Sequence, residues 1–241
     1  MIREIDVAGM IHTKAGRPDL PVFDGNGGAV LRSINPYAMV FGRDGEIYFS
    51  DTDNHLVRKL FEGRLSVVAG STLDGKSVPG REGRALNRPQ GIAIDNAGNL
   101  YIADSANNRV VMLSALDQSL TTIAGGGTSH DDAPTPALQV SLDTPTGVAV
   151  TPDGSTAYIV GDDNRVRKLD MNMRVLTTVA GQGASGCRGE ANRPEPPSCH
   201  LRTPNSLLLA NDGSGLYISE YVGGRIWKLN RDATSLTLVQ T

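Results

Sequence analysis

The sequence predicts an all-β protein that is built from four copies of one four-stranded unit. Three observations support this prediction. A proline opens each copy, short apolar runs follow it, and turns that contain Gly, Asn or Asp separate the runs. Runs this short suit β-strands better than helices, and their β-branched residues agree with that assignment. The opening prolines are Pro36, Pro89, Pro145 and Pro204.

The clearest copy of the unit spans residues 86–125, and the other full copies span residues 31–70, 142–181 and 201–241. The second run of every copy contains a tyrosine, and the fourth run leads into Ala-Gly in three of the copies. Gly and Asn in the turns supply the positive φ that hairpin corners require. We therefore expect four strands joined by tight turns in each unit.

Four meandering strands that repeat every 53 to 59 residues are typical of β-propeller blades. The first two runs are apolar on both faces, as expected of a sheet packed between two neighbouring sheets. Residues 1–16 match only the third and fourth runs, so we expect half a blade there. The prediction is a single β-propeller domain over residues 1–241, incomplete, five-blade-like or part of a larger propeller. An open blade edge would favour self-association into oligomers.

The corner between the second and third runs shows a resemblance to a known family. Residues 51–59 contain the triplet Asn54-His55-Leu56, and residues 104–110 carry a variant of the same corner. This pattern resembles the NHL repeat family, in its long-linker bacterial-like variety, and it recurs over nearly the whole chain. The resemblance implies six-bladed-type propeller repeats that serve mostly as binding platforms, with a few enzymes among them.

Composition narrows the choice of partners. The net charge of −3 and the pI near 5.8 argue against nucleic acid as the main partner. An RNA-binding surface made by Arg58, Lys59, Arg167 and Lys168 stays open as an alternative. The sequence contains no apolar run of about 18 residues, so no membrane span is expected. We expect a protein, peptide or glycan ligand.

Propeller geometry places the linkers, the residues after each proline and the corners on one face of the disc. Binding residues concentrate on loop-rich faces of this kind. The sequence therefore predicts a non-enzymatic binding scaffold that acts through its linker-rich face. The ligand-face candidates are Tyr37, Gln90, Thr146, Asn205, Arg58 and Arg109.

The corners also have a purely structural interpretation. A carboxylate at the end of the second strand can accept backbone N–H groups of the turn, and an arginine of the third strand can pair with it. The residues expected to stabilise the corners are Asp51, Asn54, Asp104, Asn107, Arg165 and Arg225. The third and fourth corners depart from the pattern at Gly161 and Glu220. A specific ligand site is therefore expected in these blades rather than in the regular ones.

Cys187 and Cys199 are the only cysteines, and both lie in the last Gly- and Pro-rich linker. A disulfide between them would contribute about 3 kcal/mol by the chain-entropy model. It would also indicate an oxidising compartment, either extracellular or periplasmic. Two reduced thiols, or a zinc site with His200 that lacks a fourth ligand, remain the alternatives.

No catalytic residue, cofactor or metal is expected from the sequence. The histidines do not form a constellation, and neither a Gly-x-Ser-x-Gly motif nor a phosphate-binding loop occurs. Two alternatives to the scaffold remain open. One is a propeller-type hydrolase or lyase with a metal at the channel mouth. The other is a propeller fragment that self-assembles and has no activity of its own.

Overall fold

The computed structural model describes residues 1–16, 27–28, 34–70, 85–181, 201–233 and 235–240. Its strands form four antiparallel sheets of four or five strands and one two-stranded hairpin. The predicted all-β fold of four-stranded blades is confirmed. We number the four larger sheets as blades 1 to 4 in chain order. Within the described residues, no helix has the length and apolar character needed to span a membrane.

Each blade is a meander that runs from an inner to an outer strand. The inner strands are β4 (Pro36–Phe41), β8 (Pro89–Ile94), β13 (Pro145–Val150) and β17 (Pro204–Leu209). The second strands are β5 (Ile47–Asp51), β9 (Leu100–Asp104), β14 (Thr156–Gly161) and β18 (Gly215–Glu220). The third strands are β6 (Leu56–Phe61), β10 (Arg109–Leu113), β15 (Val166–Asp170) and β19 (Ile226–Asn230). The fourth strands are β7 (Arg64–Gly70), β11 (Leu120–Gly125), β16 (Val175–Ala180) and β20 (Leu236–Gln240).

The N-terminal hairpin corresponds to the third and fourth strands of a blade. It consists of β1 (Ile2–Ile5) and β2 (Ile11–Ala15), with a register shift between Ile2 and Arg3. The same shift occurs at the equivalent point of all four blades, for example between Val57 and Arg58. Within the described part of the chain, the other edge of β1 pairs with no strand.

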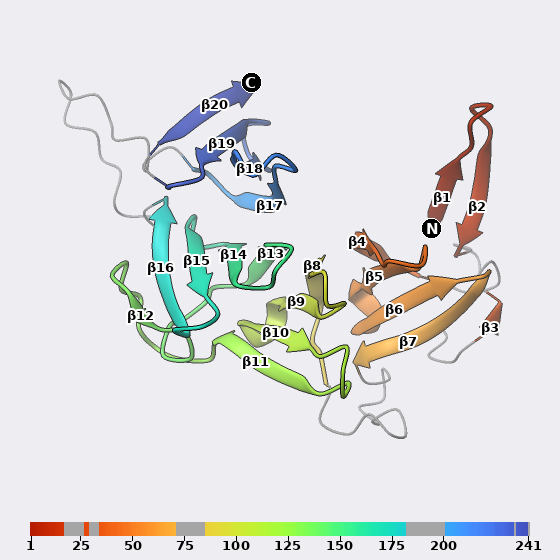
Figure 1. The fold of residues 1–241 in the computed structure, drawn as a ribbon, viewed down its shortest axis with the longest axis horizontal. Helices are drawn as coiled ribbons and strands as arrows, with labels where there is room; N and C mark the ends of the chain where they lie inside the picture. The colour runs from red at the N-terminus through yellow and green to blue at the C-terminus, as the bar shows by residue number, and fades with distance from the viewer. Residues whose placement is uncertain (17–26, 29–33, 71–84, 182–200, 234, 241) are drawn as a thin grey trace.

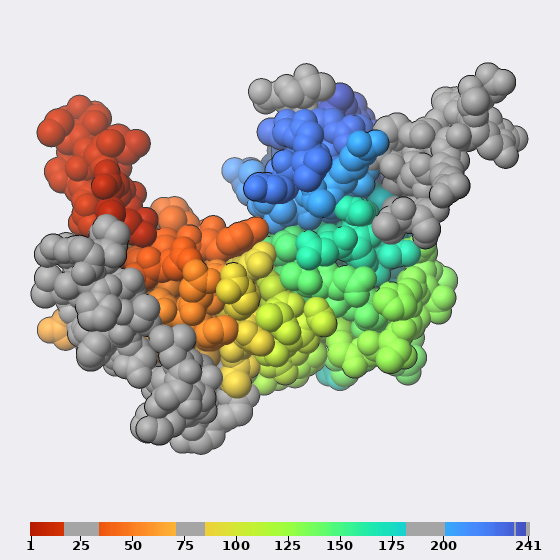
Figure 2. All heavy atoms as spheres, turned by 180° about the vertical axis from the view of Figure 1, so that it is seen from behind, coloured from red at the N-terminus to blue at the C-terminus, as the bar shows by residue number. Residues whose placement is uncertain are grey.

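The blades stand around a common centre, with the inner strands nearest to it (Figure 1). The β1–β2 hairpin lies at one end of this arc and blade 4 at the other end. Seen from behind, the molecule is hollowed between the hairpin, in red, and blade 4, in blue (Figure 2). The described blades therefore form an open arc.

The core lies between successive blades, because each inner strand alternates its side chains between two neighbours. Ile92 of β8 is buried in the cluster between blades 1 and 2, whereas the next residue, Ala93, belongs to the cluster between blades 2 and 3. In β13, Val148 and Ala149 divide in the same way between the two junctions that flank blade 3. This arrangement explains why the first runs are apolar on both faces.

The described parts of the linkers run along outer edges of blades. Strand β3 (Gly27–Gly28) pairs with β7, and β12 (Thr135–Pro136) pairs with β16. The linker between blades 2 and 3 also buries Ala137, Val140 and Leu142 in the core cluster between these blades. These linker segments cover backbone groups that an edge strand would otherwise expose.

Candidate functional site

An acidic residue ends the second strand of blades 1 and 2, and an arginine of the third strand reaches it. In blade 1, the Nε of Arg58 lies 2.6 Å from Oδ2 of Asp51, and both side chains are fully buried. In blade 2, the Nε of Arg109 lies 2.8 Å from Oδ2 of Asp104. Arg58 is therefore enclosed in the corner and does not face a ligand, although it was expected on the binding face. Arg109 keeps 30% of its side chain exposed.

The irregular blades make the same kind of pair with other residues. In blade 4, the Nε of Arg225 lies 2.6 Å from Oε2 of Glu220. In blade 3, Asp163 replaces the strand-end carboxylate and pairs with Arg167, while Nη1 of Arg165 lies 3.6 Å from the same oxygen. Each corner thus holds an acid–base pair even where the sequence departs from the pattern.

The corner asparagines support these carboxylates. The Nδ2 of Asn54 donates to Oδ1 of Asp51 at 2.8 Å, and the Nδ2 of Asn107 donates to Oδ2 of Asp104 at 2.9 Å. Both carboxylates also accept a backbone N–H from the segment that leads into the inner strand of the same blade. The corner therefore ties the two ends of its own blade together.

One further corner residue links each blade to the next. His55, Asn108 and Asn164 all occupy this position at positive φ. Their side chains accept a hydrogen bond from the backbone N–H of the residue before the next blade's proline. The donors are Arg88 at 3.1 Å, Thr144 at 3.1 Å and Thr203 at 2.6 Å. No role was expected for these residues from the sequence, although Asn and His at a repeated corner position are typical of left-handed backbone.

The second residues of the inner strands form what we call the mouth: Tyr37, Gln90, Thr146 and Asn205. Tyr37 is 49% exposed, whereas Thr146 is buried and its Oγ1 donates to the Pro204 carbonyl at 3.4 Å. Burial raises the pKa of Tyr37 above its ordinary value, and a hydrogen bond with Asn205 opposes part of that shift. Asn205 of blade 4 thus lies near Tyr37 of blade 1 at the mouth.

Strand β4 continues the exposed surface away from the mouth. Met39 is 46% exposed and Phe41 is 68% exposed. They stand at the repeat positions of Ile92 and Ile94, which pack against the preceding blade. The β1–β2 hairpin covers only part of this side of blade 1, so Met39 and Phe41 keep access to solvent. The sequence alone did not show this exposure.

One segment of the chain, which includes the corner of blade 2, matches a known repeat. The NHL repeat family matches residues 86–112, which hold the corner of blade 2. The curated relatives of the chain include NHL repeat-containing proteins, in agreement with this match.

Curated relatives of this chain are much longer proteins. NHL repeat-containing protein 2 of Gallus gallus is 29% identical over 53% of this chain and 17% of its own length. Human teneurin-1 is 32% identical over 54% of this chain and 5% of its own length. Human teneurin-4 is 26% identical over 84% of this chain and 8% of its own length. The chain thus spans about a fifth or less of these relatives.

Solved β-propeller structures share the fold of this chain. A chain of a nidogen/laminin complex superposes with a TM-score of 0.60 at 14% identity, over 88% of this chain and 66% of that one. Virginiamycin B lyase from Staphylococcus aureus gives a TM-score of 0.55 at 14% identity, over 99% of this chain and 62% of that one. At such identities the likeness establishes the fold alone.

Acidic and imidazole groups are scattered over the described part of the chain. Among the described residues, no three or more His, Cys, Asp or Glu side chains lie close enough to hold a metal ion. The Nε2 of His12 lies 2.9 Å from Oδ2 of Asp6 on the N-terminal hairpin. Cys187, Cys199 and His200, with the predicted disulfide, lie outside the described residues.

The basic residues considered for RNA do not form one accessible surface. Arg58 and Arg167 are 0% and 3% exposed, and each pairs with a carboxylate of its own corner. Only Lys59 and Lys168 of that set keep partial exposure. The geometry thus gives an RNA-binding surface little support.

Proposed function

We propose that this chain is a non-enzymatic scaffold that binds another protein. The contact surface begins at the mouth on the linker-rich face and continues along the exposed side of β4. The mouth offers phenol, amide and hydroxyl groups from Tyr37, Gln90, Thr146 and Asn205, none of which is a carboxylate or an imidazole. This chemistry suits recognition better than metal-assisted hydrolysis or elimination, for which the hydrolase or lyase alternative would need convergent ligands.

One observation carries the proposal: Tyr37, Met39 and Phe41 present a row of large side chains to solvent on an inner strand. The equivalents of Met39 in blades 2 and 3 are buried, since Ile92 and Val148 are 6% and 5% exposed. Aromatic residues and methionine are enriched at the centres of protein interfaces. Exposed side chains of this kind, in a position built for burial, favour a protein partner.

The neighbouring groove indicates the shape of that partner. A cavity of about 400 Å³ lies between the hairpin and blade 1, with Met39, Phe41 and Leu60 on its apolar side and Arg3 and Lys14 among its polar residues. The free edge of β1 borders this groove. An extended segment can add to such an edge by backbone hydrogen bonds and place alternate side chains on the apolar wall. We propose an extended β-segment of the partner protein as the occupant.

Self-association is a second candidate, favoured by the opposite end of the arc. Leu208 of β17 is 67% exposed, whereas Ala93 and Ala149 are buried at the same repeat position. Blade 4 thus exposes the side that the inner strand of a blade normally packs against the next blade. In an assembly, this side would face Met39 and Phe41 of another copy. A contact between these two unlike surfaces would be head-to-tail.

The test uses a peptide with the sequence of residues 98–104, because this segment pairs with the third strand of its own blade. The peptide should bind in a saturable manner, and a scrambled peptide should not. Phe41→Glu together with Met39→Glu should weaken binding by about tenfold or more. Leu208→Glu serves as the control, because it lies on the opposite end of the arc.

Light scattering over a concentration series decides between the two candidates. A monomer that binds the peptide supports the scaffold with a foreign partner. A mass that rises with concentration, and falls in Leu208→Glu as well as in Phe41→Glu, supports self-association. A chain that stays monomeric and binds no peptide would refute both candidates.

A further inference from the structure

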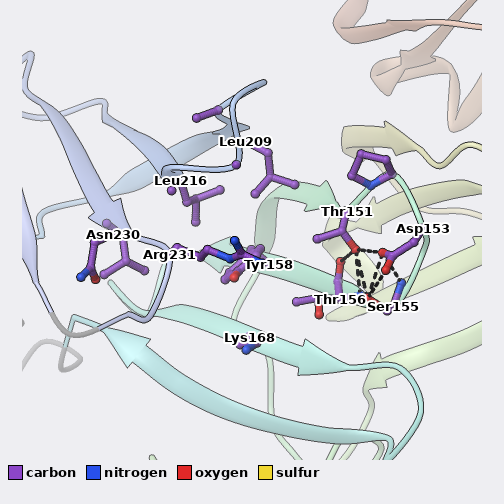
Figure 3. A pocket seen from close by; sticks show the side chains of 15 residues that line it. Thr151, Asp153, Ser155, Thr156, Tyr158, Lys168, Leu209, Leu216, Asn230 and Arg231 are labelled. Carbon is purple, nitrogen blue, oxygen red and sulfur yellow. Dashed lines mark hydrogen bonds between the residues drawn. The ribbon is translucent and has the colours of Figure 1, made fainter.

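A cavity of about 500 Å³ opens between blades 3 and 4, at the end of the strands opposite the mouth. Its volume falls within the range of small-molecule sites. Figure 3 shows Thr151, Asp153 and Ser155 on one side of it, Asn230 and Arg231 on the side of blade 4, and Lys168 on the strand below. This cavity is separate from the proposed protein-binding surface, so the inference does not rest on that function.

Three hydrogen-bond donors line this cavity without a protein partner. They are the phenol of Tyr158, the ammonium of Lys168 and the guanidinium of Arg231. Within the described part of the chain, none of these side chains makes a hydrogen bond or an ion pair. Tyr158 as a whole residue is only 9% exposed, and its side chain lines the cavity. A hydroxyl that the protein leaves without a partner in a cavity is a candidate ligand contact.

The residues that line the cavity include a charged group and an apolar group. Asp153 is engaged locally, because its Oδ1 accepts from the hydroxyl of Thr151 at 2.6 Å and from that of Ser155 at 2.9 Å. The carboxylate therefore stays within its own turn, and Lys168 and Arg231 give the cavity an excess of positive charge. The apolar part of the lining comes from Leu209, Leu216 and Leu229.

The junction between blades 2 and 3 provides an internal comparison. Met112 pairs across the strands with Tyr101, as Lys168 does with Tyr158, and Met171 holds the position of Arg231. There both methionines pack on the core and border a cavity of only about 170 Å³.

The tyrosine also differs between the two junctions. The hydroxyl of Tyr101 donates to Oδ2 of Asp95 at 3.0 Å, and the backbone N–H of Asn96 bonds the Pro152 carbonyl across the junction at 2.8 Å. In blade 3, Thr151 replaces the aspartate and bonds Asp153 instead. The polar groups at the junction between blades 2 and 3 thus bond to one another. The junction between blades 3 and 4 is open and offers unpaired donors.

We propose that the cavity between blades 3 and 4 binds a small organic carboxylate. Lys168 and Arg231 hold the anionic group, the hydroxyl of Tyr158 donates to one of its oxygens, and the leucines contact an apolar body. Charge-assisted hydrogen bonds to a carboxylate are among the stronger polar contacts in proteins. An apolar wall with a few convergent polar groups is typical of ligand sites.

The probe is 4-phenylbutyrate, titrated by calorimetry and by NMR into the full chain, with the neutral 4-phenylbutanol as its matched control. The acid should bind in a saturable manner and at least about tenfold more tightly than the alcohol. Lys168→Met with Arg231→Met copies the methionines of the preceding junction, so it should keep the fold and lose the binding. Tyr158→Phe should weaken binding without abolishing it.

Lys59→Met is the control variant, because Lys59 pairs with Tyr48 in blade 1 as Lys168 pairs with Tyr158. It should bind the acid like the unmodified chain. Equal affinity for the acid and the alcohol would mean that the cavity binds only the apolar part of the probe, and it would overturn the proposal. Unchanged binding in the double methionine variant, or no saturable binding of the acid, would overturn it as well. Thermal melts of each variant distinguish lost binding from lost folding.

Discussion

The backbone N–H of Arg88 donates a hydrogen bond to Nδ1 of His55 at 3.1 Å and thereby joins blade 2 to blade 1. Asn108 and Asn164 accept the same bond at the next two junctions. The histidine of the Asn-His-Leu triplet is therefore a structural link between blades. In blade 4 the equivalent position is Gly224, which has no side chain to make this contact.

Removal of the acceptor at His55 should weaken the junction between blades 1 and 2. His55 has a φ of 57°, which glycine adopts without strain, so His55→Gly removes only the side chain. We expect a loss of about 1 kcal/mol in the free energy of unfolding, measured by urea denaturation. His55→Asn should retain most of the stability, because asparagine serves at the other junctions. A glycine variant as stable as the asparagine variant would contradict the role of this bond.

The pair of Arg58 and Asp51 should be among the most sensitive positions of the chain. Arg58→Met leaves a carboxylate that is fully buried without its main cation, and such a change costs about 3–5 kcal/mol. Arg109→Met should cost less, because Arg109 keeps 30% of its side chain in solvent. Denaturation midpoints of the two variants measure the contrast. Equal losses would mean that burial does not set the energy of these pairs.

Tyr101 fills the junction between blades 2 and 3. It is 1% exposed and packs within the core cluster there. Tyr101→Ala should lower the free energy of unfolding by about 3–5 kcal/mol, since it leaves a large cavity. Tyr101→Phe keeps the packing and leaves Asp95 without the phenol, so it should cost about 1–3 kcal/mol. An alanine variant with unchanged melting temperature would disprove the packing role.

The same tyrosine should make stability depend on alkaline pH. Burial, with the negative charge of Asp95 as the second cause, raises the pKa of Tyr101 far above its ordinary value. Because the folded pKa is raised, the stability linked to the neutral phenol is complete below the ordinary tyrosine pKa of about 10. It is lost as the pH rises toward the folded value.

Phenolate absorbance and urea denaturation over the alkaline range measure this effect. In Tyr101→Phe the loss of stability above pH of about 10 should be smaller than in the unmodified chain. If the two chains lose stability in parallel, then Tyr101 ionises as freely in the fold as in the unfolded chain, against the prediction.

The amino-acid sequence is sufficient to predict the repeat, its strands and the four-stranded blade. Local signals sufficed, because a proline start, short β-branched runs and Gly or Asn turns report on neighbouring residues. The half blade at residues 1–16 followed from the same pattern, and the register shift at Ile2 agrees with it. The pairing of Asp104 with Arg109 could also be predicted from the sequence, since only five positions separate them.

The exposure of individual surfaces, in contrast, depends on how the blades pack. Arg58 and Arg109 look alike in the sequence, yet one is enclosed and the other is 30% exposed, because Arg58 stands two residues further along the third strand, at the repeat position of Val111. Met39 and Ile92 are equivalent in the repeat and differ in exposure because different neighbours cover them. Lys168 and Arg231 meet at one cavity only because blades 3 and 4 pack side by side. Such relations join residues tens of positions apart, and local patterns do not encode them.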